Sequence, residues 1–263
     1  MPTVHLVDAS PYIFRAYFSI PSSLRAPDGR PVNAVRGFTW FLLELLEREG
    51  VSHAAVAFDE SLNTSFRNDF YPAYKAQREL PPAELEAQLR DCRAIATALG
   101  LATFASDRYE ADDLIAALCR PLEQAGHQVI VVSPDKDLSQ LVNERVSVLD
   151  WAKQTRSGLA EVRARFGVGP ELLPDWLALV GDAVDNIPGV HGVGPKAATA
   201  LLAALGPIES LFDRLDEVAS LPLRGAASVR VKLEGRREQA LLSKRLATVA
   251  YDAPARASLD ELQ

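Results

Sequence analysis

The chain has 263 residues, of which 48% are hydrophobic and 24% are charged, and its net charge is −7. Its apolar stretches are shorter than the roughly 18–20 residues of a membrane-spanning helix, and no basic, apolar leader opens the sequence, so we expect a cytoplasmic protein with no membrane partner. Cys92 and Cys119 are isolated and the four histidines are scattered, which argues against a zinc site with Cys and His ligands.

Residues 1–150 alternate between strand and helix patterns. Continuous apolar runs rich in β-branched residues are typical of strands buried on both faces of a parallel sheet. The predicted strands are 3–8, 53–58 and 128–132, and the predicted helices are 34–48, 83–99 and 110–125. This order predicts an α/β fold with a mainly parallel sheet flanked by helices.

The strand pattern fades after about Trp151. The predicted helices from there on are 160–166, 173–181, 195–205, 208–213 and 236–248. We therefore place a boundary near residue 170, with an α/β domain over 1–170 and a smaller helical region over 171–263.

Aspartates follow the three predicted strands. Asp8 ends the first, Asp59 comes directly after the second, and Asp135 comes shortly after the third. The carboxyl ends of parallel strands meet at the edge where α/β folds bind ligands, so these carboxylates should lie close together. They would repel one another unless a cation lay between them, and a divalent cation with oxygen ligands is the simplest candidate.

Further acids cluster at a predicted helix start and in two loops. They are Glu110, Asp112, Asp113, Asp137, Asp182 and Asp185. Each has an ordinary structural explanation, because acids are favoured in the first turn of a helix and often cap turns. Together they recur in elements that would meet at one edge of the sheet. Such a cluster suits catalysis by two Mg²⁺ ions, which activate a water and stabilise the leaving oxygen of a phosphodiester.

The segment 66–78 combines aromatic and basic residues. If Pro72 begins a helix, then Tyr74, Lys75 and Arg78 share one broad face. A nucleic-acid base can stack on a tyrosine while lysine and arginine hold phosphates. The alternative is a solvated amphipathic turn with Tyr74 in the core, and the pattern alone does not decide between the two.

The segment 189–196 has the pattern of a helix–hairpin–helix. Gly192 and Gly194 permit a tight hairpin, and Pro195 begins the next helix. Backbone N–H groups at that helix start can hold a phosphate without reading base sequence. A P-loop has a different spacing and places Ser or Thr after the lysine, which Lys196 lacks. A purely structural turn is the remaining alternative.

Taken in order, these segments resemble the 5′-nuclease family, specifically the 5′→3′ exonuclease domain of bacterial DNA polymerase I and its stand-alone relatives. The matching segments are 6–8, 58–59, 65–67, 74–78, 109–113, 135–138, 181–190 and 192–196. The resemblance implies a PIN-like core with a helical arch near 60–82. It also implies a helix–three-turn–helix region after about 170 that holds duplex DNA, often with a bound potassium ion.

The resemblance also implies roles for individual residues. One metal centre would use Asp8, Asp59, Glu110 and the catalytic Asp112, and the second would use Asp113, Asp135, Asp137, Asp182 and Asp185. Lys75 and Arg78 would contact the scissile phosphate, and Tyr74 would stack on a base. The remaining DNA contacts would come from Arg15, Arg67, Gly192, Gly194 and Lys196.

The resulting expectation is a monomeric nuclease that uses Mg²⁺, with Mn²⁺ as a substitute, on DNA with a 5′ flap or a 5′ end next to duplex. The sequence ends at Gln263, so we expect no coupling of cleavage to synthesis within this chain. Two alternatives remain open. One is a branched-DNA-binding protein with little or no catalysis, and the other is an RNA-directed nuclease of the wider PIN-like group.

Overall fold

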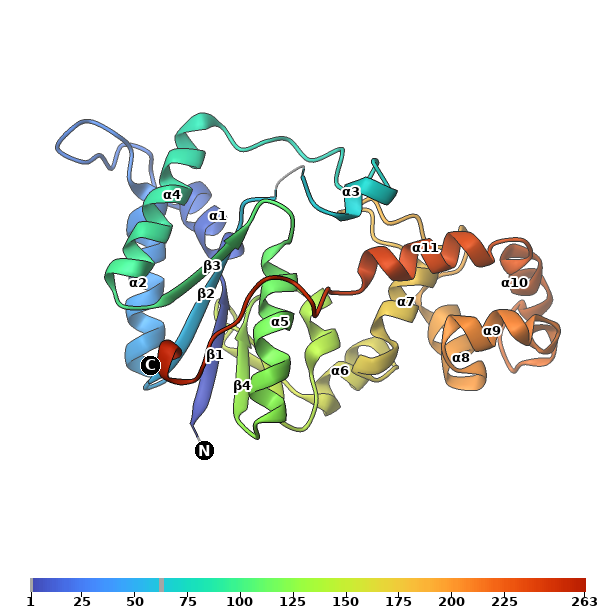
Figure 1. Ribbon diagram of the computed structural model, residues 1–263. Helices are drawn as coiled ribbons and strands as arrows, with labels where there is room; N and C mark the ends of the chain where they lie inside the picture. The colour runs from blue at the N-terminus through green and yellow to red at the C-terminus, as the bar shows by residue number, and fades with distance from the viewer. Residues whose placement is uncertain (1, 62–63) are drawn as a thin grey trace.

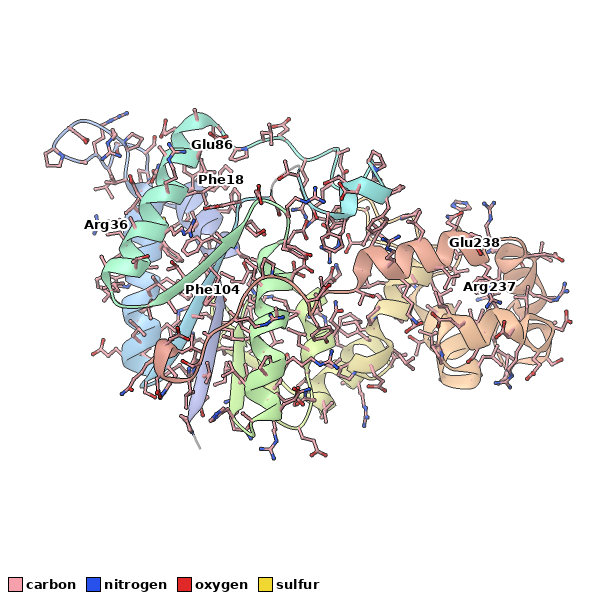
Figure 2. All side chains as sticks on the ribbon, viewed as in Figure 1. Phe18, Arg36, Glu86, Phe104, Arg237 and Glu238 are labelled. Carbon is pink, nitrogen blue, oxygen red and sulfur yellow. The ribbon has the colours of Figure 1, made fainter. Side chains whose placement is uncertain are left out.

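The computed structural model describes residues 2–61 and 64–263, which form a sheet domain and a helical region (Figure 1). The strands are β1 (Thr3–Asp8), β2 (His53–Asp59), β3 (Ala102–Ser106), β4 (Gln128–Val132), β5 (Val146–Asp150) and β6 (Thr155–Ser157). They form one sheet in the order β3-β2-β1-β4-β5-β6, in which β1 to β5 run parallel and β6 pairs antiparallel with β5. The predicted α/β class and its mainly parallel sheet are confirmed.

Helices cover both faces of the sheet. The helices of the sheet domain are α1 (Ser10–Ser19), α2 (Asn33–Arg48), α3 (Arg67–Phe70), α4 (Ala83–Ala98), α5 (Ala111–Gln124) and α6 (Leu159–Phe166). Residues of β1 alternate between the two faces, so that Val4 and Leu6 pack in the core that contains α5, and Val7 packs in the core that contains α1, α2 and α4. This burial on both faces explains why the strand is mostly apolar, although it contains the buried His5.

The helical region lies beside the sheet domain (Figure 1). Its helices are α7 (Leu173–Val180), α8 (Pro195–Leu205), α9 (Ile208–Asp213), α10 (Ala226–Leu233) and α11 (Arg237–Ala247). After α11 the chain runs back to the sheet domain, where Val249, Ala255 and Leu262 are buried in the same core as α5. Among the described residues, no helix is both long and apolar enough to cross a bilayer.

Some elements are absent from the sequence prediction. Residues 10–19, which follow β1, form helix α1, and Pro11 lies in its first turn. Strands β3, β5 and β6 and helix α10 were not predicted. β3 is half-buried along its whole length and lies at the edge of the sheet, so its sequence lacks a continuous apolar run.

The predicted helix that begins at Pro72 is wrong. Helix α3 ends at Phe70, and residues 72–77 form turns. Lys75 has a φ of +54°, which a right-handed helix cannot contain. Residues 62–63 of the predicted arch lie outside the described residues.

The sheet order creates a crevice for the site. The chain runs from β1 to β2 and β3 on one side and then crosses back to β4 on the other side of β1, so the strand order reverses beside β1. In open α/β sheets, ligands bind beyond the carboxyl ends of the strands at such a point. Asp8 and Asp59 end two of these three strands, and Asp135 follows the third.

Candidate active site

The aspartates at the strand ends are held by short local contacts. Asp8 is 4% exposed, and its Oδ2 accepts a hydrogen bond of 2.8 Å from Ser133 Oγ. Asp59 Oδ1 accepts a hydrogen bond of 2.7 Å from the backbone N–H of Ala111. The other oxygen of Asp8, Oδ1, is buried and has no hydrogen-bond partner. A buried anionic oxygen without a donor is costly, and a cation would satisfy it.

Helix α5 brings two more acids to the same edge. Glu110 is the N-cap of this helix, and Asp112 lies in its first turn, where the helix dipole favours negative charge. Burial raises the pKa of Asp112 well above its usual value, and the charges of Asp135 and Asp8 add to this effect. Burial and then the charge of Asp59 raise the pKa of Asp8 in the same way. These carboxylates therefore lie close enough to repel one another.

A cavity of about 370 Å³ opens beside these acids. Its polar wall contains Asp8, Asp59, Lys75, Arg78, Glu110, Asp112 and Asp135. Its other wall is apolar and includes Phe14, Phe18 and Leu80. The cavity is thus lined by several carboxylates, by the cations Lys75 and Arg78, and by an apolar surface that suits a nucleotide.

The remaining acids come from a loop after β4 and from a turn that follows α7. Asp182 and Ile187 close this turn with two backbone hydrogen bonds of 2.8 and 3.0 Å. Burial and then the charge of Asp135 raise the pKa of Asp137 to about 7. Asp185 lies 3.6 Å from Lys75 Nζ, so the turn is joined to the acids of α5 through this lysine. The structure thus draws together acids that are far apart in the sequence.

Lys75 and Arg78 lie among the acids, as the sequence predicts, but in turns rather than on a helix. Lys75 Nζ donates to Glu110 Oε2 at 2.9 Å, and Arg78 pairs with Asp185. Burial opposes the charge of Lys75, yet Glu110 and Asp185 hold its pKa well above the usual value. Strained backbone is typical of functional sites, and the left-handed conformation of Lys75 is such a case.

Asp113 and Arg67 do not lie where the sequence expectation put them. Arg67 is 3% exposed, and its guanidinium donates to both carboxylate oxygens of Asp113 at 2.7 and 2.9 Å. Asp113 is fully buried and also accepts from the backbone N–H groups of Glu110 and Ala250. Because every oxygen of Asp113 is already satisfied, we correct its role from metal ligand to structural anchor. Arg67 is likewise too buried to contact DNA.

The expected role of Tyr74, which was to stack on a base, is also corrected. Its side chain is 4% exposed, and its hydroxyl donates to Glu110 Oε2 at 3.1 Å. The ring therefore packs in the core, as the alternative prediction stated, and has no exposed face on which a base could stack. Its hydroxyl instead positions Glu110.

The predicted DNA-contacting residues elsewhere are exposed. Arg15 lies on α1, and Lys196 lies in the first turn of α8. Gly194 is the N-cap of α8, and a Cβ at this position would meet open space. Gly192 has a φ of +80°, which glycine adopts easily, and its carbonyl accepts a hydrogen bond from Lys232. The helix start is thus open to a phosphate.

The residues fit divalent metal ions by their chemistry, although no complete set of ligands is in place. Among the described residues, no three His, Cys, Asp or Glu side chains already surround one ion position. The donors are nevertheless carboxylate oxygens, which Mg²⁺ and Mn²⁺ prefer, and Asp8 has a buried oxygen without a partner.

Sequence reasoning missed two polar residues at the site. Ser133 orients Asp8 from the end of β4, and Lys136 pairs with Asp182 from the loop after it. Lys136 stands between Asp135 and Asp137 in the sequence, so its position among acids was a signal that could have been used. Ser133 carried no comparable signal, because a serine after a strand is common in turns.

Two family models match the chain. One, described as the 5′–3′ exonuclease N-terminal resolvase-like domain, matches residues 3–167, and the other, the 5′–3′ exonuclease C-terminal SAM fold, matches residues 168–263. The chain is 41% identical over 258 residues to DNA polymerase I of Pseudomonas aeruginosa, covering 98% of the chain and 28% of that protein. The chain thus spans under a third of the length of such polymerase relatives.

Shorter relatives match over most of their length. The chain is 32% identical to a 5′–3′ exonuclease of Buchnera aphidicola over 98% of the chain and 89% of that protein. A bacteriophage T5 flap endonuclease, solved as a pseudo-enzyme–product complex with DNA and metal ions, has the same fold with a TM-score of 0.75 at 22% identity, covering 93% of this chain and 88% of that one. The chain therefore belongs to the 5′–3′ exonuclease family of nucleases.

Proposed function

We propose that this protein cleaves DNA near a 5′ flap or a 5′ end next to duplex, with two Mg²⁺ ions in the acidic cavity. The observation that carries the proposal is the group of buried and half-buried carboxylates at the ends of β1 and β2 and the start of α5. Asp8 has an oxygen without a partner there, and Asp112 has a raised pKa. Such a group is unfavourable without cations, which is the arrangement expected of a divalent metal site.

The residues would divide the work as follows. Asp8, Asp59, Glu110, Asp112 and Asp135 would hold the ions, with Asp137, Asp182 and Asp185 completing the second position. When bound, such ions activate water and stabilise the charge on a phosphodiester in its transition state. The residues proposed for the ions all lie in the cavity or in the two loops beside it.

Lys75 and Arg78 would act on the phosphate itself. Both line the cavity, and both are held by carboxylates that the ions would also bind. Once those carboxylates bind ions, the two side chains are free to place positive charge on the phosphate oxygens in the transition state. Cleavage is expected to leave a 5′-phosphate and a 3′-hydroxyl.

The helical region would supply the grip on duplex. The start of α8 presents backbone N–H groups beside exposed Lys196, which suits a phosphate and reads no base sequence. We therefore expect selectivity for the shape of the DNA. A bound potassium ion near this hairpin remains a prediction.

The test is cleavage of a labelled duplex that carries a 5′ flap, compared with the same duplex carrying a 3′ flap. We expect cutting near the 5′-flap junction with Mg²⁺ and none with EDTA, and little cutting of the 3′ flap. Equal cutting of both substrates would contradict the proposed selectivity. Binding of the 5′ flap without turnover, in Mg²⁺ and in Mn²⁺, would instead favour the branched-DNA-binding alternative.

A further inference from the structure

The loop after β4 places a lysine among the acids proposed for the two ions, which we call the acidic group. These acids are Asp8, Asp59, Glu110, Asp112, Asp135, Asp137, Asp182 and Asp185. Lys136 Nζ hydrogen-bonds to Asp182 Oδ2 and lies 3.3 Å from Asp137 Oδ1. The two carboxylates are nearly buried, with side chains 7% and 13% exposed, whereas the lysine side chain is 35% exposed. The ammonium group is therefore held between two carboxylates that belong to the proposed second ion position.

Three of the four acids of the first ion position lack such a partner, and the fourth, Glu110, pairs with Lys75 at 2.9 Å. Within the described part of the chain, no lysine or arginine forms an ion pair with Asp8, Asp59 or Asp112, and Asp8 Oδ1 lacks any hydrogen bond. The acidic group thus has two unequal halves. Each half contains a buried oxygen without a hydrogen bond, Asp8 Oδ1 in one and Asp137 Oδ1 in the other, but only Asp137 and Asp182 pair with Lys136.

The geometry shows which part would have to move when an ion enters. Asp182 is fixed, because its turn is closed by backbone hydrogen bonds to Ile187 and its Oδ1 accepts from the N–H of Val184 at 2.8 Å. Lys136 is attached through a flexible four-carbon stem and is partly exposed. The ammonium group can therefore swing into solvent while the carboxylates stay in place.

We infer that Lys136 is an internal counter-ion of the second metal position, and that a divalent ion binds Asp137 and Asp182 only by displacing its ammonium group. This inference rests on the proposed function. Two cations cannot occupy one position, so the energy of the Lys136 pairs is subtracted from the affinity of the second ion. Lys136 forms no ion pair with Asp8, Asp59 or Asp112, so it does not compete with the first ion.

Lys136 would consequently weaken the binding of the second ion, so that the two ions bind one after the other. It neutralises part of the acidic group when that ion is absent, which stabilises the metal-free protein. It also joins the loop after β4 to the turn that follows α7. When the ion displaces the ammonium group, the ion itself would join these two segments through Asp137 and Asp182.

The experiment measures ion binding by the full chain without DNA. Mn²⁺ is titrated and followed by electron paramagnetic resonance and by calorimetry, for the wild type and for Lys136→Met. We expect the second Mn²⁺ to bind about tenfold more tightly to the variant, with the first unchanged. Lys136→Arg, which keeps the charge, should retain the weak second site.

A matched control is Lys153→Met. Lys153 also forms an ion pair, at 2.9 Å with Asp150, but its side chain is 74% exposed and lies outside the acidic group. This variant should bind both ions as the wild type does. Thermal unfolding without metal gives a second readout, because only Lys136→Met removes the cation of two nearly buried carboxylates and should lower the melting temperature.

The outcomes separate the inference from the function on which it rests. A folded Lys136→Met protein whose second Mn²⁺ binds with wild-type affinity would overturn the inference, as would weaker DNA binding with unchanged Mn²⁺ binding, which would assign Lys136 to a phosphate. A wild-type protein that binds no Mn²⁺ would instead overturn the proposed function.

Discussion

Asp113 and Asp112 are neighbours in the sequence with opposite expected effects when replaced. Asp113→Asn removes the charge that pairs with Arg67 and disturbs four hydrogen bonds, two from the guanidinium and two from backbone N–H groups. Arg67, at 3% exposure, cannot turn to solvent for compensation. Breaking one partner of a buried ion pair costs about 3–5 kcal/mol, and we expect a loss of about 4 kcal/mol in the free energy of unfolding.

Urea unfolding followed by circular dichroism measures this loss, and Asp112→Asn is the control. Burial and then the charges of neighbouring carboxylates raise the pKa of Asp112, so its neutral variant should be as stable as the metal-free wild type or more stable. The double variant Arg67→Met with Asp113→Leu should lose less than the sum of the single losses, since neither charge is then left unpaired. A loss below about 1 kcal/mol for Asp113→Asn would refute the anchoring role.

Three further predictions concern pH, backbone and metal. Burial and then the charge of Arg156 lower the pKa of His5 to about 4, so on acidification the unfolded chain binds this proton before the folded protein does. The free energy of unfolding should therefore fall by about 3 kcal/mol between pH 6.5 and 4, and His5→Leu should remove this loss. Gly189→Ala should cost at least about 2 kcal/mol because its Cβ would lie 2.4 Å from the backbone nitrogen of Gly181, whereas Gly194→Ala meets open space and should unfold like the wild type in urea. The raised pKa of Asp112 means that the metal-free protein loses stability as pH rises through that pKa, so Mg²⁺ should raise the melting temperature at pH 8 more than at pH 5, and Asp112→Asn should reduce this difference.

Much of the sheet could be predicted because buried parallel strands have sequences that are mostly apolar. The runs ending at Asp8 and Asp59 gave the position of the acids as well as of the strands. β3 could not be found in this way, because an edge strand that is half-buried needs no such run. This strand forms because it pairs with β2 and because helices pack against it.

The candidate site could be predicted as a set of acids but not as individual roles. Asp112 and Asp113 have the same charge in adjacent positions, and only the helix phase, which turns Asp113 inward against Arg67, separates them. Tyr74 likewise has a pattern that suits either a stacked base or a core contact, and its burial decides for the core. The location of Lys136 against Asp182 depends on the meeting of two distant loops, which no local pattern encodes.

The most direct test of the central claim is metal-dependent cleavage by the pair of neighbouring variants. Wild type, Asp112→Asn and Asp113→Asn are compared on a 5′-labelled flap duplex at a temperature where circular dichroism shows all three to be folded, with Mg²⁺ or with EDTA. We expect cutting near the junction by the wild type and by folded Asp113→Asn, and loss of cutting in Asp112→Asn with flap binding retained. Near-normal turnover by Asp112→Asn, or wild-type cutting in EDTA, would contradict it.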